Sequence, residues 1–198
     1  MPRIGLNLPT LIHAATEIAD NQGLEAVTIA LLAQKLKIRS PSLYNHVKGL
    51  PDIRRQLALS GIAQMSEVFT RALVGKSGDA AVQAFCYAYL TFARAHPGLY
   101  EAVQRAAEPD DKLLKEAGGD MVQIAVKALE EYGLRGDEAI HSVRGMRSML
   151  HGFVSLERQG GFGYPLDLDV TFRLLVQTFL EGIKAMQSNS NNYGPPAG

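Results

Sequence analysis

The stretch from Thr28 to Ile53 constrains the fold of this chain more than any other, because it predicts two short helices joined by a tight turn. Thr28 is a good helix N-cap, since its hydroxyl can accept one of the free amide protons at a helix start. Lys37 to Arg39 interrupts the helical pattern, so we expect the turn there. The apolar residues before the turn recur at helical spacing and form one stripe: Ile29, Leu32, Ala33 and Leu36.

The second short helix is predicted to begin with Ser40 as its N-cap and Pro41 in its first position. Proline is tolerated there because the amide proton that it lacks has no partner inside the helix. Leu43 and Val47 lie four residues apart and can both face inward. A short helix that presents polar and aromatic groups, and that packs against a capped helix, suits insertion into the major groove of DNA. The residues expected to face outward are Ser42, Asn45 and His46, with Tyr44 at the boundary.

The segment Ser40–Lys48, SPSLYNHVK, closely resembles the recognition helix of TetR-type (tetracycline-repressor-like) bacterial transcriptional regulators. The resemblance implies an all-α fold, with a helix-turn-helix DNA-binding head over residues 1–48 and a helical ligand-binding and dimerisation domain over residues 49–187. It further implies a homodimeric repressor that a small-molecule effector releases from a palindromic DNA operator. The alternative is a helical small-molecule-binding or interaction protein without a role on DNA.

By this resemblance, the outward side chains divide into those that read base edges and those that hold phosphates. Arg39 can serve either purpose. The residues expected at base edges are Ser40, Ser42 and Asn45. The residues expected at phosphates are Thr28, Tyr44, His46 and Lys48.

One position departs from the family pattern. Many TetR-type regulators have a basic residue where this chain has Leu50, and that residue anchors a phosphate at the start of the next helix. Leucine cannot do so. We therefore expect Lys48 to take the role, assisted by the backbone amides and positive helix end near Pro51 and Asp52.

The net charge of the chain is zero, but the charge is unevenly spread. Residues 1–57 hold seven Lys or Arg and four acidic residues, a net charge of +3. The remaining 141 residues hold 13 basic and 16 acidic residues, a net charge of −3. Arg3, on a short N-terminal arm, belongs to the basic segment. A basic head on an acidic body indicates a phosphate-binding part joined to a part that does not bind phosphate.

Apolar residues at three- and four-residue spacing predict helices through the rest of the chain. Residues 188–198 are polar and rich in Pro and Gly, so we expect a disordered tail. In the family the last two long helices pair with their copies in a second subunit. The helices are expected near residues 9–22, 50–73, 79–95, 97–106, 111–132, 137–157 and 169–186. The first of them is marked by the apolar positions Ile12, Ala15, Ile18 and Ala19 and is expected to stop at Gly23.

The helix near residues 79–95 is apolar nearly all round, which is typical of a buried helix. Its aromatic stripe is compatible with two interpretations, core packing or the lining of a small-molecule cavity, and both stay open. The residues predicted to bind a ligand on the second interpretation are Phe85, Tyr89, Phe92, His96, Tyr100, Met121, Met149, His151 and Phe153.

Two segments resemble one subgroup of the family, whose body domain is named for a Trp-His-Gly-type motif. They are the turn His96-Pro97-Gly98 and the stretch from Arg147 to Glu157. This chain has no tryptophan, and Ser148 or Met149 stands near the place where that residue would fall.

The sequence argues against several other classes of protein. No apolar run approaches the ~20 residues of a membrane span, and no signal sequence is present, so we expect a cytoplasmic protein without a membrane partner. The lone Cys86 allows no internal disulfide. The five histidines are too dispersed for a zinc motif, and the Glu-x-x-His of Glu138 and His141 has no second copy, as a di-iron site would need. We expect no catalytic residues, no metal and no cofactor.

Overall fold

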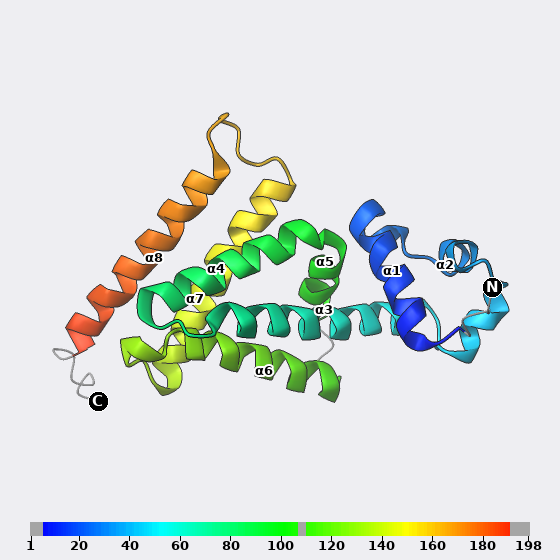
Figure 1. Ribbon diagram of the computed structural model, residues 1–198, viewed down its shortest axis with the longest axis horizontal. Coiled ribbons are helices and arrows are strands. Elements are labelled where there is room, and N and C mark those ends of the chain that lie inside the picture. The colour runs from blue at the N-terminus through cyan, green and yellow to red at the C-terminus, as the bar shows by residue number, and fades with distance from the viewer. Residues whose placement is uncertain (1–5, 107–109, 191–198) are drawn as a thin grey trace. The chain divides into compact units, whose positions relative to one another are not determined.

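The structure, a computed structural model, describes residues 6–106 and 110–190, with side chains up to Met186 (Figure 1). Arg3 and residues 191–198 of the predicted tail lie outside this range. Every regular element within it is a helix, so the all-α fold is confirmed. Among these helices none is long and apolar enough to cross a membrane. They are α1 (Leu8–Gln22), η1 (Leu24–Ala26), α2 (Ile29–Leu36), η2 (Ser40–Asn45), α3 (Leu50–Leu73), α4 (Gly78–Ala95), α5 (Pro97–Arg105), α6 (Lys112–Ala128), η3 (Glu130–Tyr132), α7 (Gly136–Arg158) and α8 (Leu168–Ser190).

The chain forms two compact units. Unit one contains the described residues up to Ser66 together with Phe92–Gly119, and unit two contains Glu67–Thr91 and the described residues from Asp120 onward. The predicted functional boundary between residues 48 and 49 stays a prediction. Helix α8 runs to Ser190, four residues beyond its expected end.

Helix α1 begins at a side-chain cap and ends at a glycine. The side chain of Asn7 accepts a hydrogen bond from the amide of Thr10 at 2.9 Å, which caps the helix. Gly23 ends it as predicted, with a φ of 91° that glycine adopts without steric cost. Leu24 and Val27 are buried beneath the helix. Its inward residues are buried as expected: Ile12, Ala15, Ile18 and Ala19.

Within unit one, α5 approaches α1 closely. A Cβ atom on Gly98 would lie 2.1 Å from the carbonyl oxygen of Ala19, so only glycine fits between the two backbones. Asp20 uses one carboxylate oxygen to accept hydrogen bonds from the amides of Gly98 and Leu99, each at 3.0 Å. Its other oxygen lies 2.9 Å from Nδ1 of His96. Asp20 therefore caps α5 from a different helix and ties α5 to the end of α1.

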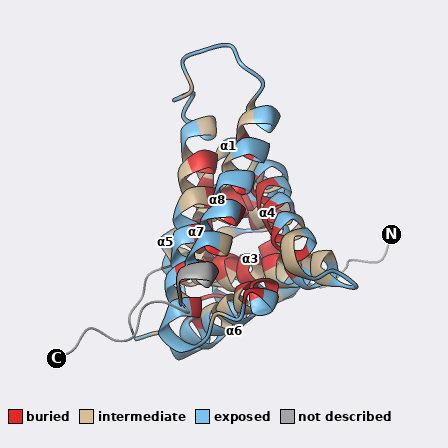
Figure 2. Cartoon of the chain, turned by 90° about the vertical axis from the view of Figure 1, so that its left-hand side faces the viewer, coloured by how far each residue is buried: buried red, intermediate tan, exposed pale blue. Residues whose placement is uncertain are grey.

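In unit two, α7 and α8 lie side by side and run antiparallel (Figure 1). The loop between them is almost entirely exposed (Figure 2). Gly145 and Ser148 are exposed on α7, and a Cβ on Gly152 would meet no atom within 4 Å. The small-residue side of α7 is thus uncovered within the described chain. The buried face of α8 consists of Phe172, Val176, Leu180 and Ile183.

A polar cluster joins three elements of unit two. Asp79, in the first turn of α4, accepts hydrogen bonds from the hydroxyl of Tyr132 and from Nζ of Lys184, both at 2.6 Å. These contacts hold the pKa of the Asp79 carboxyl below its ordinary value, chiefly through Lys184 and secondly through Tyr132. The cluster therefore links α4, η3 and α8 through one ionised carboxylate.

Candidate nucleic-acid interface

Helix α2 is capped as the sequence predicts. The hydroxyl of Thr28 accepts a hydrogen bond from the amide of Leu31 at 3.2 Å. Lys37 ends the helix in the left-handed conformation, with φ 54° and ψ 42°, and it is the one non-glycine residue in the described chain with a positive φ. This conformation makes the sharp turn that leads from α2 to the reading segment, residues 40–47.

The reading segment differs from the prediction in its geometry. Ser40–Asn45 is a 3₁₀ helix rather than an α-helix, with hydrogen bonds from Ser42 to Arg39 and from His46 to Leu43, both at 2.9 Å. The N-cap is Arg39, so the prediction that Ser40 caps this helix is wrong. Ser40–Asn45 is only six residues long. It forms hydrogen bonds between residues three apart and does not complete an α-helical turn that would need a cap.

The inward side of the reading segment agrees with the expected pattern, whereas Ser42, expected to face outward, is half-buried and Tyr44, expected at the boundary, is 59% exposed. Leu43 and Val47 are 0% and 3% exposed, so these two residues fix the segment on the head. Of the eight residues predicted to touch DNA, Ser40 and Ser42 are half-buried. The exposed ones are Thr28, Arg39, Tyr44, Asn45, His46 and Lys48. Their individual contacts with DNA stay predictions.

The start of α3 carries its own cap. Asp52 accepts a hydrogen bond from the amide of Lys48 at 2.9 Å, which places a carboxylate at the helix end where the sequence suggested a phosphate. Leu50, which stands where the family often has a basic residue, is half-buried and lines a groove of unit one. The side chain of Lys48 is exposed and extends from the same corner.

The basic residues in the described part of the segment 1–57 fall into two groups. Lys35 pairs with Glu17 at 3.1 Å and lowers the pKa of that carboxyl, mainly through a hydrogen bond. Arg54 and Arg55 also pair with carboxylates of unit one. Within the described residues, no ion pair engages the three basic side chains that flank the reading segment. These are Lys37, Arg39 and Lys48.

The residues predicted to bind a ligand are divided between the two units. In unit one, the rings of Phe92 and His96 lie 5.2 Å apart, and Tyr100 is buried. His96 also lines a polar groove with His13 and Glu17. Its contact with Asp20 shows a structural use for this side chain that the sequence did not reveal.

The other six predicted ligand residues lie in unit two. The ring of Phe69 contacts Phe85 and Tyr89, at centroid distances of 4.5 and 6.0 Å. Phe153 contacts Phe172 at 5.0 Å, so it packs between α7 and α8. These rings have core contacts, and their role toward a ligand stays a prediction. Met121, Met149 and His151 are half-buried.

Burial lowers the pKa of the His151 imidazole, and the charge of Arg147 lowers it further. In the part of the chain that the structure describes, no group of three or more His, Cys, Asp or Glu side chains is placed to hold a metal ion.

Sequence reasoning missed the residues that brace the head. Asp52 could have been found, because it sits four residues after Lys48 at the start of an expected helix. Asp20 and His96 are 76 residues apart, and no local pattern connects them. The same holds for Glu25, which pairs with Arg54 and Arg105.

Comparisons with known proteins agree with this geometry. Residues 82–179 match the profile of the tetracyclin repressor-like C-terminal domain. The chain is 36% identical over 189 residues to the uncharacterized HTH-type transcriptional regulator YobS of Bacillus subtilis, covering 95% of this chain and 98% of that one. It is 32% identical to the uncharacterized HTH-type transcriptional regulator Rv0681 of Mycobacterium tuberculosis, covering 90% of this chain and 82% of that one.

Solved structures share the fold at low sequence identity. A protein of unknown function from Rhodococcus sp. RHA1 superposes with a TM-score of 0.78 at 20% identity, over 92% of this chain and 98% of that one. TetR from Acinetobacter baumannii superposes with a TM-score of 0.69 at 20% identity, over the same shares of the two chains. A variant of that TetR has been solved in complex with minocycline. The subgroup resemblance stays a prediction, although both of its segments fall within the matched residues.

Proposed function

Since this chain belongs to the TetR family and is a DNA-binding HTH-type transcriptional regulator, we propose that it is a repressor released from a palindromic operator by a small molecule. The observation that supports the site is the group of three basic side chains without ion pairs in the described chain, Lys37, Arg39 and Lys48. They flank an exposed segment held by Leu43 and Val47. Cations left unneutralised beside an exposed polar segment suit a phosphate backbone.

The proposed roles of the individual residues follow from their exposure and from the hydrogen-bonding groups that they carry. Asn45 is exposed and has both a donor and an acceptor, so it suits a base edge, with Ser40 and Ser42 beside it. The groups proposed for phosphates are Thr28, Tyr44, His46 and Lys48, and Arg39 suits either role.

A homodimer is the proposed working form. One short reading segment contacts few bases, whereas two of them about 34–36 Å apart reach successive major grooves of a palindrome. The uncovered small residues of α7 allow a helix of a second copy to approach closely. Val170 and Leu174 of α8 are 39% and 54% exposed, which leaves apolar surface for the same contact.

Release by a ligand is proposed as a population shift. A ligand that binds better to a conformation with the two reading segments wrongly spaced lowers the affinity for the operator. An effect on a promoter requires a coupling of about 1–3 kcal/mol. The likeness in fold to a TetR variant that has been solved with minocycline, 21% identical to this chain, supports the proposal that a ligand causes release. A regulator of this kind acts on the chromosome in the cytoplasm, and its role needs neither catalysis nor a cofactor.

Binding of the full-length chain to the DNA upstream of its own coding region tests the proposal. We expect a discrete gel shift that a scrambled duplex of equal length does not compete away. Selection from randomised duplexes then tests base reading: Asn45→Ala changes the preferred bases, whereas the exposed Gln123→Ala on α6 does not. Equal affinity for the scrambled duplex, or an unchanged preference in Asn45→Ala, contradicts the assignment.

Ligand release has its own test. Small molecules that raise the melting temperature of the chain are added to the operator complex, and the operator affinity is measured with and without each one. We expect at least one stabilising compound to weaken operator binding by about fivefold or more, the lower end of typical allosteric coupling. Unchanged operator affinity with every bound compound refutes release.

A further inference from the structure

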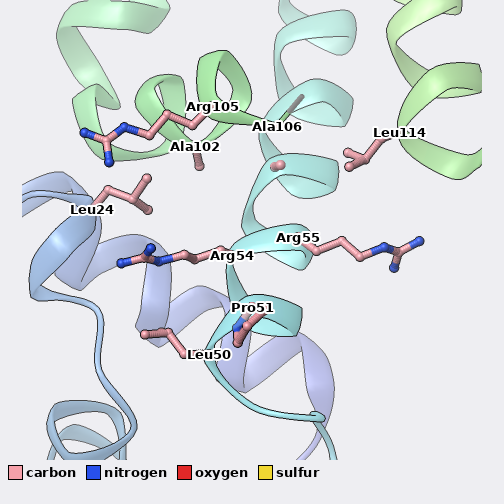
Figure 3. Close-up of a pocket in the computed structure, with 10 residues that line it drawn as sticks. Leu24, Leu50, Pro51, Arg54, Arg55, Ala102, Arg105, Ala106 and Leu114 are labelled. Atoms are coloured by element: carbon pink, nitrogen blue, oxygen red, sulfur yellow. The ribbon is translucent and has the colours of Figure 1, made fainter. Parts of the chain in front are cut away.

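Unit one contains a groove of about 320 Å³ whose lining combines apolar side chains with three arginines (Figure 3). Its apolar part includes Leu24, Leu50, Ala58 and Leu114. The volume lies at the lower end of the range for small-molecule sites. The nine residues predicted from the sequence to bind a ligand all belong to the described chain, and none of them lines this groove.

Two of the three arginines act together. Figure 3 shows the guanidinium groups of Arg54 and Arg105 on the side of Leu24, and that of Arg55 on the opposite side. Arg55 is bound to Asp111, with Nη2 3.1 Å from the carboxylate. Arg54 and Arg105 instead share one carboxylate: Nη2 of Arg54 lies 2.7 Å from Oε2 of Glu25, and Nη1 of Arg105 bonds to Oε1.

Glu25 therefore shows which chemical group this arginine pair holds. One oxygen of its carboxylate goes to each arginine, and both hydrogen bonds lower the pKa of Glu25, that from Arg105 first. The Glu25 side chain is 64% exposed, so water competes with these ion pairs and they contribute little to stability. A carboxylate on a ligand can take the place of Glu25 between the same two arginines.

One hydrogen-bond donor of the Arg54 guanidinium is unused in the described chain. Its Nε atom is buried and finds no acceptor among the residues that the structure describes. A buried donor without a partner carries a free-energy cost that an incoming oxygen atom removes. Apolar side chains adjoin the pair along the groove, so a charged head with an alkyl chain matches both halves of the lining.

We propose that this groove binds a small amphiphilic anion, an alkyl carboxylate of about eight carbons by the size of the groove. Its carboxylate replaces Glu25 between Arg54 and Arg105, and its chain lies along Leu24 and Leu50. The apolar chain contributes binding free energy by leaving water, and the arginine pair selects the charged head.

Replacement of Glu25 has a structural consequence. Glu25 belongs to η1, the short segment between α1 and α2, and its carboxylate ties η1 to α3 and α5. An anion in the groove releases that tie and frees the segment that leads to α2. Its effect on operator binding rests on the proposed function, whereas the binding of the anion does not.

Isothermal titration of the full chain with octanoate tests the site. We expect Arg54→Gln and Arg105→Gln each to weaken octanoate binding at least about tenfold, because each removes one charge-assisted contact. Glu25→Gln is expected to tighten it severalfold, because the carboxylate shared by both arginines is gone, although Glu101 still pairs with Arg105 at 2.6 Å. Arg71→Gln is the matched control, since Arg71 pairs with Glu67 on the exposed surface of α3 outside the groove. Octan-1-ol is expected to bind more weakly than octanoate.

Several results overturn the site. One is octanoate binding that is no tighter than octan-1-ol binding, and another is a Glu25→Gln chain that binds octanoate no more tightly than Arg71→Gln does. If either arginine variant does not fold, as judged by its melting temperature, the Glu25→Gln result decides. Operator binding is measured separately: a chain that binds octanoate but no operator refutes the proposed function alone, and one that binds the operator but not octanoate refutes this site alone.

Discussion

The carboxylate of Asp20 on α1 lies 2.9 Å from the imidazole of His96 and also caps α5 through the amides of Gly98 and Leu99. One side chain thus serves as a hydrogen-bond partner and as a helix cap across 76 residues of chain. The Asp20 side chain is 14% exposed, so water replaces these contacts poorly if they are lost. The attachment of α1 to α5 within unit one depends on this carboxylate.

Substitution of Asp20 separates its two roles. Asp20→Ala removes the cap and the contact with His96, and we expect it to lower the free energy of unfolding by about 2 kcal/mol. Asp20→Asn keeps an oxygen for the two amides and should lose about half as much. Urea unfolding measures both, with the exposed Asp120→Ala as control. Equal losses in Asp20→Asn and Asp20→Ala would mean that the cap contributes nothing.

Gly98 is expected to tolerate no side chain. A Cβ there would overlap the backbone of Ala19 at 2.1 Å, so Gly98→Ala forces α5 away from α1 and should cost about 3 kcal/mol. The control is Gly119→Ala on the exposed side of α6, where a Cβ meets no atom within 4 Å. That change should stabilise the chain by up to about 1 kcal/mol, because alanine favours the helix. Denaturant midpoints that order the two variants the other way would refute the close approach.

The Asp79 cluster predicts a pH dependence. Because the folded-state pKa of Asp79 is lowered, its ionised form stabilises the chain above the unfolded value near 3.8, and this contribution disappears as the pH falls through the folded value. We expect Asp79→Asn to lower the free energy of unfolding by about 1 kcal/mol at neutral pH, an amount limited by solvent screening. The difference from the unsubstituted chain should shrink only below pH 3.8. A difference that persists unchanged into stronger acid would show that ionisation of Asp79 is not its source.

Lys37 holds a conformation that costs a residue with a Cβ about 1 kcal/mol. Lys37→Gly should therefore raise the melting temperature while weakening operator binding, because a cation beside the reading segment is lost. Gln123→Gly, in the exposed interior of α6, serves as control and should lower the melting temperature instead. A Lys37→Gly chain that is less stable than the unsubstituted one would mean that the lysine side chain stabilises the turn.

The features that the sequence predicts correctly depend on interactions between residues close together in the chain. Thr28, Gly23 and the pair Leu43 and Val47 act through neighbours within four residues, so spacing alone identifies them. The 3₁₀ geometry of Ser40–Asn45 was missed because only one buried residue, Leu43, falls within these six, and a single position does not distinguish the two kinds of helix.

The features that the sequence did not predict depend on contacts between segments far apart in the chain. The tie of Asp20 to α5 and the sharing of Glu25 between Arg54 and Arg105 depend on the packing of α1, α3 and α5. Such packing leaves no periodic pattern in the sequence, so the sequence did not predict it. Asp52 lies between these cases, since its place in the first turn of α3 was visible but its capping role was read as a site for a phosphate.

The salt dependence of operator affinity tests the central claim most directly, namely that the reading segment and its flanking cations bind DNA. For each phosphate contact, the slope of the logarithm of the binding constant against the logarithm of salt concentration changes by about one. We expect Lys48→Ala to weaken binding to all duplexes alike and to reduce the slope by about one, while Lys127→Ala leaves both unchanged. A Lys48→Ala chain with the slope and affinity of the unsubstituted protein would contradict the account.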